Sequence, residues 1–382
     1  VMEACPVDSR TAYIALNMME DIGPVSVRSL VTALGSPQAI FQAGKDDLFK
    51  AEGIGPALVE KIVSQRGRLR PDEELARARK QGYEIITPAD ATYPKPLLTI
   101  HDPPLALYVW GTLAPGDKRA IAVVGSRHTT LYGRETAEKF GFHLAKTGFV
   151  VVSGLARGID TAAHRGALQG GGRTLAVLGG ALDCLYPEEN AELALGIARQ
   201  GAVLSEFPLG RQPDKTTFPM RNRIVSGLCL GVLVVEAGPT SGALITASQA
   251  LDQGRCVFAV PGRIDSPASK GSHQLLKQGA RLVESVDDIL EEFEFLIPPA
   301  GHGALPGRNA LIQAKPDAEN LPPLNPDEEK IVRALAEEEL DMDTLTRTTG
   351  VPASALSVLI LGLEMKRVVR MLPGRRVALI RR

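Results

Sequence analysis

The sequence predicts an α/β protein whose middle part is a doubly wound, mostly parallel sheet, with a smaller domain on each side. Three observations predict this class. Between about residues 121 and 290, short β-branched runs alternate with amphipathic stretches of helix length, as in parallel sheets covered by helices on both faces. Before this region, two glycine turns precede helical stretches, and after it residues 298–326 hold seven prolines. These changes predict domains at 1–88, 89–297 and 327–382, with a linker at 298–326.

Length and composition agree with this division. A chain of 382 residues is long enough for two or three domains, and 44% hydrophobic with 23% charged residues is ordinary for a globular protein. No apolar run approaches the ~20 residues of a membrane span, and residues 1–10 lack the apolar centre of a signal peptide. We therefore expect a cytoplasmic protein without a membrane partner. The cysteines Cys5, Cys184, Cys229 and Cys256 are scattered, so we expect buried thiols and no metal site.

The first predicted domain, residues 1–88, consists of short helices. Its two glycine turns, Ile22-Gly23-Pro24 and Gly53-Ile54-Gly55-Pro56, each stand before a helical stretch, which is typical of a SAM-like or helix-hairpin-helix unit. Glycine at a helix start lets backbone amides approach a phosphate, but such units also serve as docking scaffolds. We expect a docking domain, with DNA contact as the alternative.

Seven apolar runs predict the strands of the central sheet: residues 121–124, 150–153, 174–178, 203–205, 231–235, 257–260 and 282–283. Ligands of such sheets bind beyond the carboxyl ends of the strands. Glycine or serine begins the loops there, as at Gly125, Ser153 and Ser241, and amides exposed at helix starts favour anions. We therefore expect a phosphate-bearing ligand. Gly125 does not begin a Gly-x-Gly-x-x-Gly motif and no P-loop motif occurs, so we expect no nucleotide cofactor.

The segment from Arg211 to Arg223 has an unusual composition. It places four cations around Phe218 in a chain with only 4% aromatic residues. Cations beside a planar ring are typical of single-strand binding, because phosphates meet the charges and a base stacks on the ring. Alternatively, Phe218 fills the core while Arg221 and Arg223 form structural salt bridges. The residues alone leave both interpretations open.

The C-terminal segment, residues 327–382, predicts a winged-helix-like domain. Helical stretches on both sides of Gly350-Val351-Pro352 fit a helix-turn-helix, and residues 368–371 and 377–380 fit a β-hairpin. The basic stretch from Lys366 to Arg382 could contact a DNA backbone, which would make the protein a regulator that binds duplex DNA. The predicted recognition helix, Ala353–Met365, has almost no side chains that read bases, and it is better suited to protein contacts.

Four motifs of the central domain resemble those of the DNA-processing protein A (DprA/Smf) family. They are Gly125-Ser126-Arg127, the run from Ser153 to Asp160, Lys215-x-x-Phe218-Pro219-x-Arg221-Asn222-Arg223-Ile224, and the run from Ser241 to Thr246. The resemblance implies a Rossmann-like domain that binds single-stranded DNA. It further implies a protein without catalytic residues that protects incoming DNA, loads RecA recombinase during natural transformation and forms a homodimer.

The resemblance also implies roles for individual residues. Arg127 and Lys215 would contact the strand, Phe218 would stack a base, and Arg221, Asn222 and Arg223 share their motif. Phosphates would be positioned by the loops that hold Ser153, Gly154, Arg157 and Gly158 and, on the other side, Ser241 and Gly242. The dimer interface would include Leu251, His273, Leu276 and Leu282.

An enzymatic alternative is a nucleotide-processing hydrolase of the LOG type, which cleaves a nucleoside monophosphate at its glycosidic bond. A buried Glu236 beside a glycine-containing loop could stabilise a sugar cation. However, the loop reads Gly238-Pro239-Thr240-Ser241-Gly242 rather than Pro-Gly-Gly-x-Gly-Thr. The sequence therefore favours strand binding.

Overall fold

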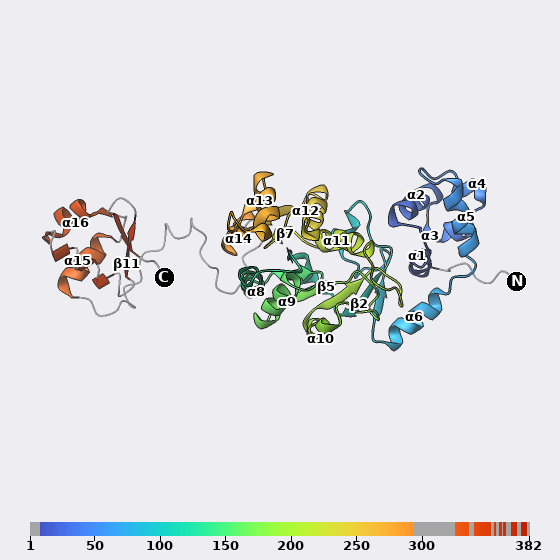
Figure 1. The fold of residues 1–382 in the computed structure, drawn as a ribbon, viewed down its shortest axis with the longest axis horizontal. Helices are drawn as coiled ribbons and strands as arrows, with labels where there is room; N and C mark the ends of the chain where they lie inside the picture. The colour runs from blue at the N-terminus through green and yellow to red at the C-terminus, as the bar shows by residue number, and fades with distance from the viewer. Residues whose placement is uncertain are drawn as a thin grey trace. The chain divides into compact units, whose positions relative to one another are not determined.

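The computed structural model describes residues 8–293, 325–335, 340–352, 355–356, 359–360, 362–363, 368–372 and 376–379. The chain forms two compact units, Val1–Glu294 and Phe295–Arg382 (Figure 1). The predicted linker at 298–326 lies almost entirely outside the described residues. The predicted boundaries at residues 88, 297 and 326 stay predictions.

Six helices form the N-terminal part of the larger unit: α1 (Ser9–Asn17), α2 (Pro24–Leu34), α3 (Pro37–Gln42), α4 (Lys45–Leu48), α5 (Pro56–Gln65) and α6 (Pro71–Lys80). Helices α2 and α5 begin directly after Gly23 and Gly55, each with proline as its first residue, where the missing N–H is not needed. Leu16, Leu30 and Ile62 pack in the core that these helices enclose. A helix thus follows each glycine turn, as predicted.

A nine-stranded sheet lies next along the chain: β1 (Glu84–Ile86), β2 (Leu107–Gly111), β3 (Ala120–Val124), β4 (Val150–Ser153), β5 (Thr174–Val177), β6 (Ala202–Ser205), β7 (Gly231–Val234), β8 (Cys256–Ala259) and β9 (Arg281–Leu282). Their order across the sheet is β1-β2-β6-β5-β4-β3-β7-β8-β9. Strands β3 to β9 pair in parallel. They are the seven predicted strands, which confirms the mostly parallel sheet.

The sequence did not predict β1 and β2. Both are antiparallel and extend the sheet beyond β6. Strand β1 has only three residues, and β2 follows a proline-rich connector that contains the short helix α7 (Lys95–Leu98), so neither has a clear pattern of its own. Since β1 precedes residue 88, the sheet takes one strand from the region predicted to be helical.

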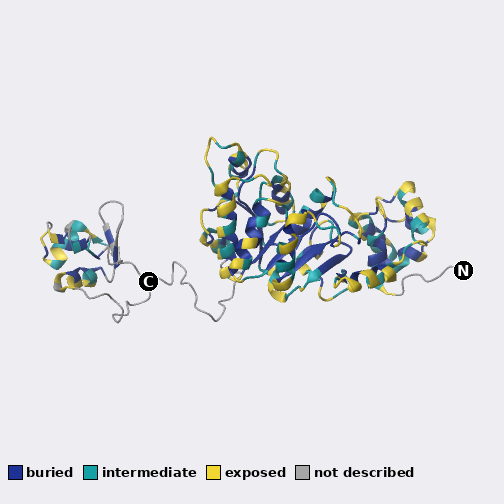
Figure 2. Ribbon diagram, turned by 60° about the horizontal axis from the view of Figure 1, so that its bottom comes forward, coloured by how far each residue is buried: buried dark blue, intermediate teal, exposed yellow. Residues whose placement is uncertain are grey.

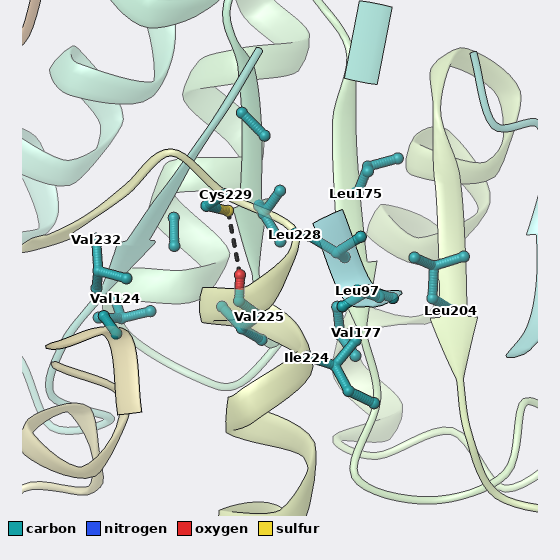
Figure 3. Close-up of a cluster of buried hydrophobic side chains, with 14 of the residues drawn as sticks. Leu97, Val124, Leu175, Val177, Leu204, Ile224, Val225, Leu228, Cys229 and Val232 are labelled. Carbon is teal, nitrogen blue, oxygen red and sulfur yellow. Dashed lines mark hydrogen bonds between the residues drawn. The ribbon is translucent and has the colours of Figure 1, made fainter. Parts of the chain in front are cut away.

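Helices cover both faces of the sheet. The helices α8 (Leu131–Lys146), α9 (Ile159–Gln169) and α10 (Ala191–Gln200) lie on one face, and α11 (Thr217–Gly227), α12 (Gly242–Asp252) and α13 (Lys270–Lys277) lie on the other (Figure 1). Alternate strand residues face each layer: Val177 and Leu204 pack against Ile224 of α11 (Figure 3). Helix α14 (Asp287–Phe293) ends the described part of this unit.

Each helix that covers the sheet has a buried face and an exposed face. Buried residues concentrate in the strands and on the inward helix faces, while exposed residues lie on the outward faces (Figure 2), as expected of amphipathic helices on a sheet. No helix among the described residues is long and apolar enough to cross a membrane.

The order of the strands creates a switch point at β3. From β3 the chain adds β4, β5 and β6 on one side, and then returns so that β7 pairs with the other side of β3. The loops after β3 and β7 therefore diverge to opposite faces of the sheet. In doubly wound sheets the ligand crevice lies at this place, beyond the carboxyl ends of the strands.

The smaller unit contains α15 (Pro326–Ala334), β10 (Leu340–Asp341), α16 (Met342–Thr349), β11 (Val369–Leu372) and β12 (Arg376–Leu379). The hairpin of β11 and β12 is the predicted one, and β10 adds a third strand beside β12. Leu345, Leu356 and Val377 pack in its core. The predicted recognition helix lies partly outside the described residues, as does much of the basic stretch from Lys366 to Arg382; positions 355–356, 359–360 and 362–363 are helical.

Candidate nucleic-acid interface

A pocket of about 490 Å³ opens at the switch point between β3 and β7. The loop after β3, the first turns of α11 and the loop that leads from β7 into α12 form most of its wall. Eight of the twelve residues predicted to bind DNA line it: Arg127, Gly154, Lys215, Phe218, Arg221, Asn222, Ser241 and Gly242. The lining does not include Ser153, Arg157, Gly158 or Arg223.

The loop after β3 holds Arg127 at the pocket through backbone bonds on both sides. The Ser126 N–H donates to the carbonyl of Glu236 (2.7 Å), and the Ser126 carbonyl accepts from Ile159 N–H (3.2 Å). Gly158 has φ +77°, and a Cβ there would lie 2.3 Å from the Ser126 carbonyl oxygen, so only glycine permits this approach. Gly158 therefore positions the Arg127 loop. Arg127 itself is exposed and makes no hydrogen bond or ion pair with another described residue.

Glu236, two residues after the end of β7, holds the loop after β3 through hydrogen bonds. Its Oε2 accepts from the Thr129 hydroxyl (2.5 Å) and the Thr130 N–H (2.8 Å), and its Oε1 accepts from the Thr130 hydroxyl (2.7 Å). Thr130 in turn caps α8. Because three donors occupy this buried carboxylate, it serves the loop structure. The geometry does not favour the hydrolase alternative, in which Glu236 would stabilise a sugar cation.

The loop after β4 is closed by Asp160 rather than open to a phosphate. The Asp160 Oδ2 accepts from the N–H groups of Gly154 (3.0 Å) and Ala156 (3.3 Å), and the buried Ser153 hydroxyl donates to the Val123 carbonyl (2.7 Å). Burial raises the pKa of Asp160, while the charge of Arg221 acts in the opposite direction. Because the Gly154 N–H already has an acceptor, the geometry does not favour the expectation that this amide positions a phosphate.

Lys215 stands at the end of a segment that the rest of the domain holds in place. The Asn17 amide donates to the Glu206 carbonyl (2.9 Å), and the buried Glu74 carboxylate accepts from the Leu209 N–H (2.8 Å). Asp214 then accepts from the N–H groups of Thr216 (2.7 Å) and Thr217 (3.1 Å) at the start of α11. Lys215 is exposed and makes no hydrogen bond or ion pair with another residue that the structure describes.

The Phe218 ring lies in the first turn of α11, between a cation and a glycine. The Arg127 guanidinium carbon lies over the ring, 4.6 Å from its centroid. A Cβ on Gly179, after β5, would lie 2.6 Å from a ring carbon, so a larger residue there would displace the ring. Phe218 is half-buried. It therefore neither fills the core nor presents a bare ring, because Arg127 covers one of its faces.

Arg221 and Arg223 are buried, in contrast to Arg127 and Lys215. Arg223 is 5% exposed, and its guanidinium forms two hydrogen bonds with Glu206 (2.8 and 2.6 Å) and an ion pair with Asp102 (2.7 Å). It ties α11 to the connector before β2, away from the pocket. Because Glu206 and Asp102 occupy its guanidinium, the geometry does not favour DNA contact by Arg223, which stays a prediction. Arg223 instead forms a structural salt bridge, which is the alternative interpretation of this segment.

Arg221 lines the floor of the pocket although it is only 4% exposed. One of its terminal nitrogens donates to the Val177 carbonyl. Burial lowers the pKa of Arg221 to about 10, and the charge of Asp160 partly offsets this effect, so the group stays charged at neutral pH. Arg221 thus supplies positive charge beneath the pocket and offers little surface for contact.

The start of helix α12 forms another part of the pocket wall. Ser241 caps it by accepting from the Ala243 N–H (3.3 Å), and the Asn222 amide donates to the Gly242 carbonyl (3.5 Å) across the pocket. Amides in the first turn of a helix have no partner within it and favour an anion. Ser241, Gly242 and Asn222 all line the pocket, and their contact with DNA stays a prediction.

Arg157 lies outside the pocket and has protein partners. It forms two hydrogen bonds with Glu189 (2.6 and 2.7 Å) and donates to the Tyr186 hydroxyl (3.2 Å). The pairing with Glu189 and Tyr186 raises the pKa of Arg157 above the ordinary value of an arginine. Its charge is thus partly neutralised, which weakens the expectation that it contacts a phosphate directly.

The four residues predicted at a dimer interface lie on α12, α13 and β9. Leu251 and Leu282 are exposed, and β9 pairs only with β8 in the described sheet, so its other edge is open. His273 Nε2 lies 3.0 Å from the Gly262 carbonyl oxygen, and Leu276 packs partly against the core. The two leucines with exposed side chains are therefore the stronger candidates for contact with another chain.

The sequence did not identify Asp160 and Glu74 as residues that hold the loops around the pocket, nor Tyr186 as a neighbour of the Phe218 ring. Asp160 was noted only as part of a motif, and its position two residues into α9 after a glycine is the signal that could have identified it as an amide acceptor. Glu74 lies in a charged helix, and no pattern distinguishes it from Glu73. Tyr186 lies in a loop with no motif.

Three family models match the chain. The model of DNA recombination-mediator protein A matches residues 84–294, that of the SAM-like helix-hairpin-helix tandem matches residues 13–67, and that of the DprA winged helix domain matches residues 315–375. The first covers the sheet and the pocket. The other two agree with the predicted N- and C-terminal domains.

Relatives and solved structures agree with these matches. The chain is 35% identical to Protein Smf of Synechocystis sp. over 97% of this chain and 98% of that protein, and 48% identical to DNA processing protein DprA of Streptococcus pneumoniae over 56% of this chain and 76% of that protein. The structure of DprA from Streptococcus pneumoniae aligns with a TM-score of 0.65 at 37% identity, covering 74% of this chain and 96% of that chain. That of DNA processing protein A from Helicobacter pylori aligns with a TM-score of 0.51 at 29% identity, covering 56% and 97%. The chain therefore belongs to the DNA recombination-mediator protein A (DprA/Smf) family.

Proposed function

We propose that this protein binds single-stranded DNA at the pocket between β3 and β7 and acts as a recombination mediator without catalysis of its own. One observation carries the proposal: Arg127 and Lys215, two cations without an acidic partner among the described residues, line the same pocket as the half-buried ring of Phe218. Unpaired charge and a stacking surface at one site are what a flexible polyanion with planar bases requires.

The chemistry of the site suits a strand more than a single nucleotide. Arg127 and Lys215 would contact phosphates and release counterions, and the first-turn amides of α12 would favour a further phosphate. A base would stack on the surface that Arg127 and Phe218 form, worth ~1–3 kcal/mol per base. Such contacts involve backbone and ring faces, so little sequence preference is expected.

The family supports this function, and it suggests a role for the bound strand. DNA processing protein A from Helicobacter pylori binds single-stranded DNA, and the family is described as a recombination mediator. We infer that the protein protects an incoming strand and loads RecA onto it. The test is the rate at which RecA filaments form on single strands: the wild-type protein is expected to raise this rate, and Phe218→Ala is expected not to.

The positions of the carboxylates favour binding over hydrolysis. Among the described residues that line the pocket, Asp160 is the one carboxylate, and it accepts bonds from two amides. A hydrolase would need a carboxylate free to protonate the base or stabilise the sugar cation. Incubation with adenosine monophosphate is therefore expected to release no adenine; release of adenine would revive the enzymatic alternative.

We further propose a homodimer formed through β9 and α12. The open edge of β9 offers unpaired backbone groups, and such edges pair with a second chain unless they are covered. Leu282 and Leu251 place exposed apolar side chains at this part of the domain. Sedimentation is expected to show a dimer for the wild type and a monomer for Leu282→Arg, because a charge would be buried in the interface. Leu98→Arg, at an exposed leucine of α7, should remain a dimer.

Binding can be tested at the residues that carry the proposal. Lys215→Ala and Phe218→Ala are expected to weaken the binding of a single-stranded oligonucleotide in a gel-shift titration at fixed salt. Met220→Ala is the matched control, because Met220 is an exposed residue of the same helix that does not line the pocket. Equal affinity for all four proteins would refute the assignment of the site.

A further inference from the structure

An exposed aromatic ring, Tyr186, stands beside the pocket without a role in the site described above. It lies in the loop between β5 and α10, and the residue is 44% exposed. Its ring centroid is 6.2 Å from that of Phe218, with the two planes tilted by 53°. Exposing a large ring to water is unfavourable, and in a chain with only 4% aromatic residues two neighbouring rings at one surface call for an explanation.

Tyr186 is also held in position. Arg157 donates to its hydroxyl (3.2 Å), and the Arg157 guanidinium carbon lies 5.6 Å from its ring centroid. Glu189 fixes Arg157 with two hydrogen bonds. Four groups therefore form a row: the guanidinium of Arg127, the rings of Phe218 and Tyr186, and the guanidinium of Arg157. The two aromatic rings of this row lie between two cations, and Arg127 and Phe218 also line the pocket.

The spacing of the rings suits a nucleic-acid strand. The 6.2 Å between their centroids is roughly twice the ~3.4 Å rise per nucleotide of a stacked strand. Neighbouring bases of an extended strand could therefore each meet a ring. The tilt between the planes is compatible only with a strand whose bases are separated from one another, as in single-strand binding.

We propose that Tyr186 is a second base-stacking surface, which extends the strand path from Phe218 out of the pocket along the loop after β5. The inference rests on the proposed single-strand binding, and it assigns to the site a further contact residue. Arg157 then serves mainly to position Tyr186, because its guanidinium is already paired with Glu189.

The affinity test compares three variants with the wild type on a single-stranded oligonucleotide long enough to pass the pocket. Tyr186→Ala is expected to weaken binding roughly 5- to 150-fold, the loss of one stacked base, and Tyr186→Phe is expected to bind within about twofold of the wild type. Tyr132→Ala is the matched control, since Tyr132 is an exposed tyrosine of α8 that does not line the pocket. Affinity within about twofold for Tyr186→Ala would overturn the inference.

A fluorescence test separates direct stacking from an effect transmitted through Phe218. In a Trp110→Phe background, which removes the chain's single tryptophan, Tyr186→Trp places the only indole at the predicted surface. A bound strand is expected to quench it, while Tyr132→Trp in the same background should be unchanged. Weak binding by Tyr186→Ala without quenching would show that Tyr186 only supports Phe218, and the inference would be wrong.

The same experiments distinguish this inference from the proposed function. If Phe218→Ala loses affinity and Tyr186→Ala does not, strand binding at the pocket stands and the second surface is rejected. If neither variant loses affinity, the pocket does not bind the strand, and both proposals fail.

Discussion

The guanidinium carbon of Arg127 lies 4.6 Å from the centroid of the Phe218 ring, so a cation covers the surface on which a base would be expected to stack. Arg127 is exposed and has no other partner among the described residues, and the ring keeps its planar group in one orientation. A strand that enters the pocket would therefore stack a base on the guanidinium or displace it from the ring. In both cases the two side chains act as one unit.

The first prediction concerns this pair. Arg127→Lys keeps the charge but loses the planar group, so it is expected to weaken single-strand binding by less than Arg127→Ala while leaving the salt dependence unchanged. Because the two residues share one surface, the double variant Arg127→Ala with Phe218→Ala is expected to lose less than the sum of the single effects. Fluorescence anisotropy titrations of the wild type, the two single alanine variants and the double variant measure this coupling. Additive losses would show that the two side chains act independently.

The second prediction concerns the salt dependence of binding. Lys215 has no ion pair among the described residues, whereas Arg211, four residues earlier, is paired with Asp214 (2.6 Å). Lys215→Ala is expected to reduce the slope of log affinity against log salt by about 0.7, the value for one phosphate of a single strand. Arg211→Ala should change the slope much less. Equal changes in the two slopes would contradict the distinction between free and paired cations.

The third prediction concerns stability rather than binding. Arg223→Met removes the partner of the buried Glu206, and an unpaired buried charge costs ~3–5 kcal/mol. The free energy of unfolding, measured in urea, is expected to fall by that amount, whereas the exposed Lys215→Ala should change it by less than about 0.5 kcal/mol. A wild-type value for Arg223→Met would contradict the structural role of this arginine.

The fourth prediction concerns pH. His164 is fully buried beside Thr174 (2.7 Å between Nδ1 and the hydroxyl), and burial lowers its pKa to about 3, whereas an unfolded chain has a histidine pKa of ~6.5. Between these values the unfolded chain binds one more proton. The contribution of His164 to the free energy of unfolding is therefore fully present above about pH 6.5. It is lost as the pH falls below that value, by up to ~1.4 kcal/mol per pH unit.

The variant His164→Gln tests this directly, since glutamine does not titrate. Its free energy of unfolding, followed by urea titration between pH 4 and 6 (roughly the middle of that window), is expected to decline less steeply with falling pH than that of the wild type. The comparison uses slopes, so a uniform loss of stability in the variant does not affect it. Parallel curves would mean that His164 is not buried in its neutral form.

The central sheet was predictable because its strands have a local pattern. β3 to β8 are short, mostly apolar runs between helices, as burial on both faces of a sheet favours. Strands β1 and β2 were not predictable, since β1 has only three residues, β2 follows a proline-rich connector, and both pair with antiparallel neighbours that the sequence does not indicate.

The same limit applies to the site. Lys215 and Arg223 look alike in the sequence, eight residues apart, but they differ in the fold because Arg223 meets Glu206 and Asp102. Those partners are 17 and 121 residues away along the chain, so only the tertiary structure distinguishes a paired cation from a free one. The motif from Lys215 to Ile224 predicted the position of the proposed interface. The ion pairs of the fold determine which of its cations remain available to a ligand.

The most direct test of the proposed interface is a set of titrations of single-stranded and duplex oligonucleotides over a salt series. The wild type would be compared with the triple variant Arg127→Ala, Lys215→Ala, Phe218→Ala. We expect the wild type to prefer the single strand, and the triple variant to lose this preference while it stays folded. A folded triple variant that retains wild-type affinity for the single strand would contradict it.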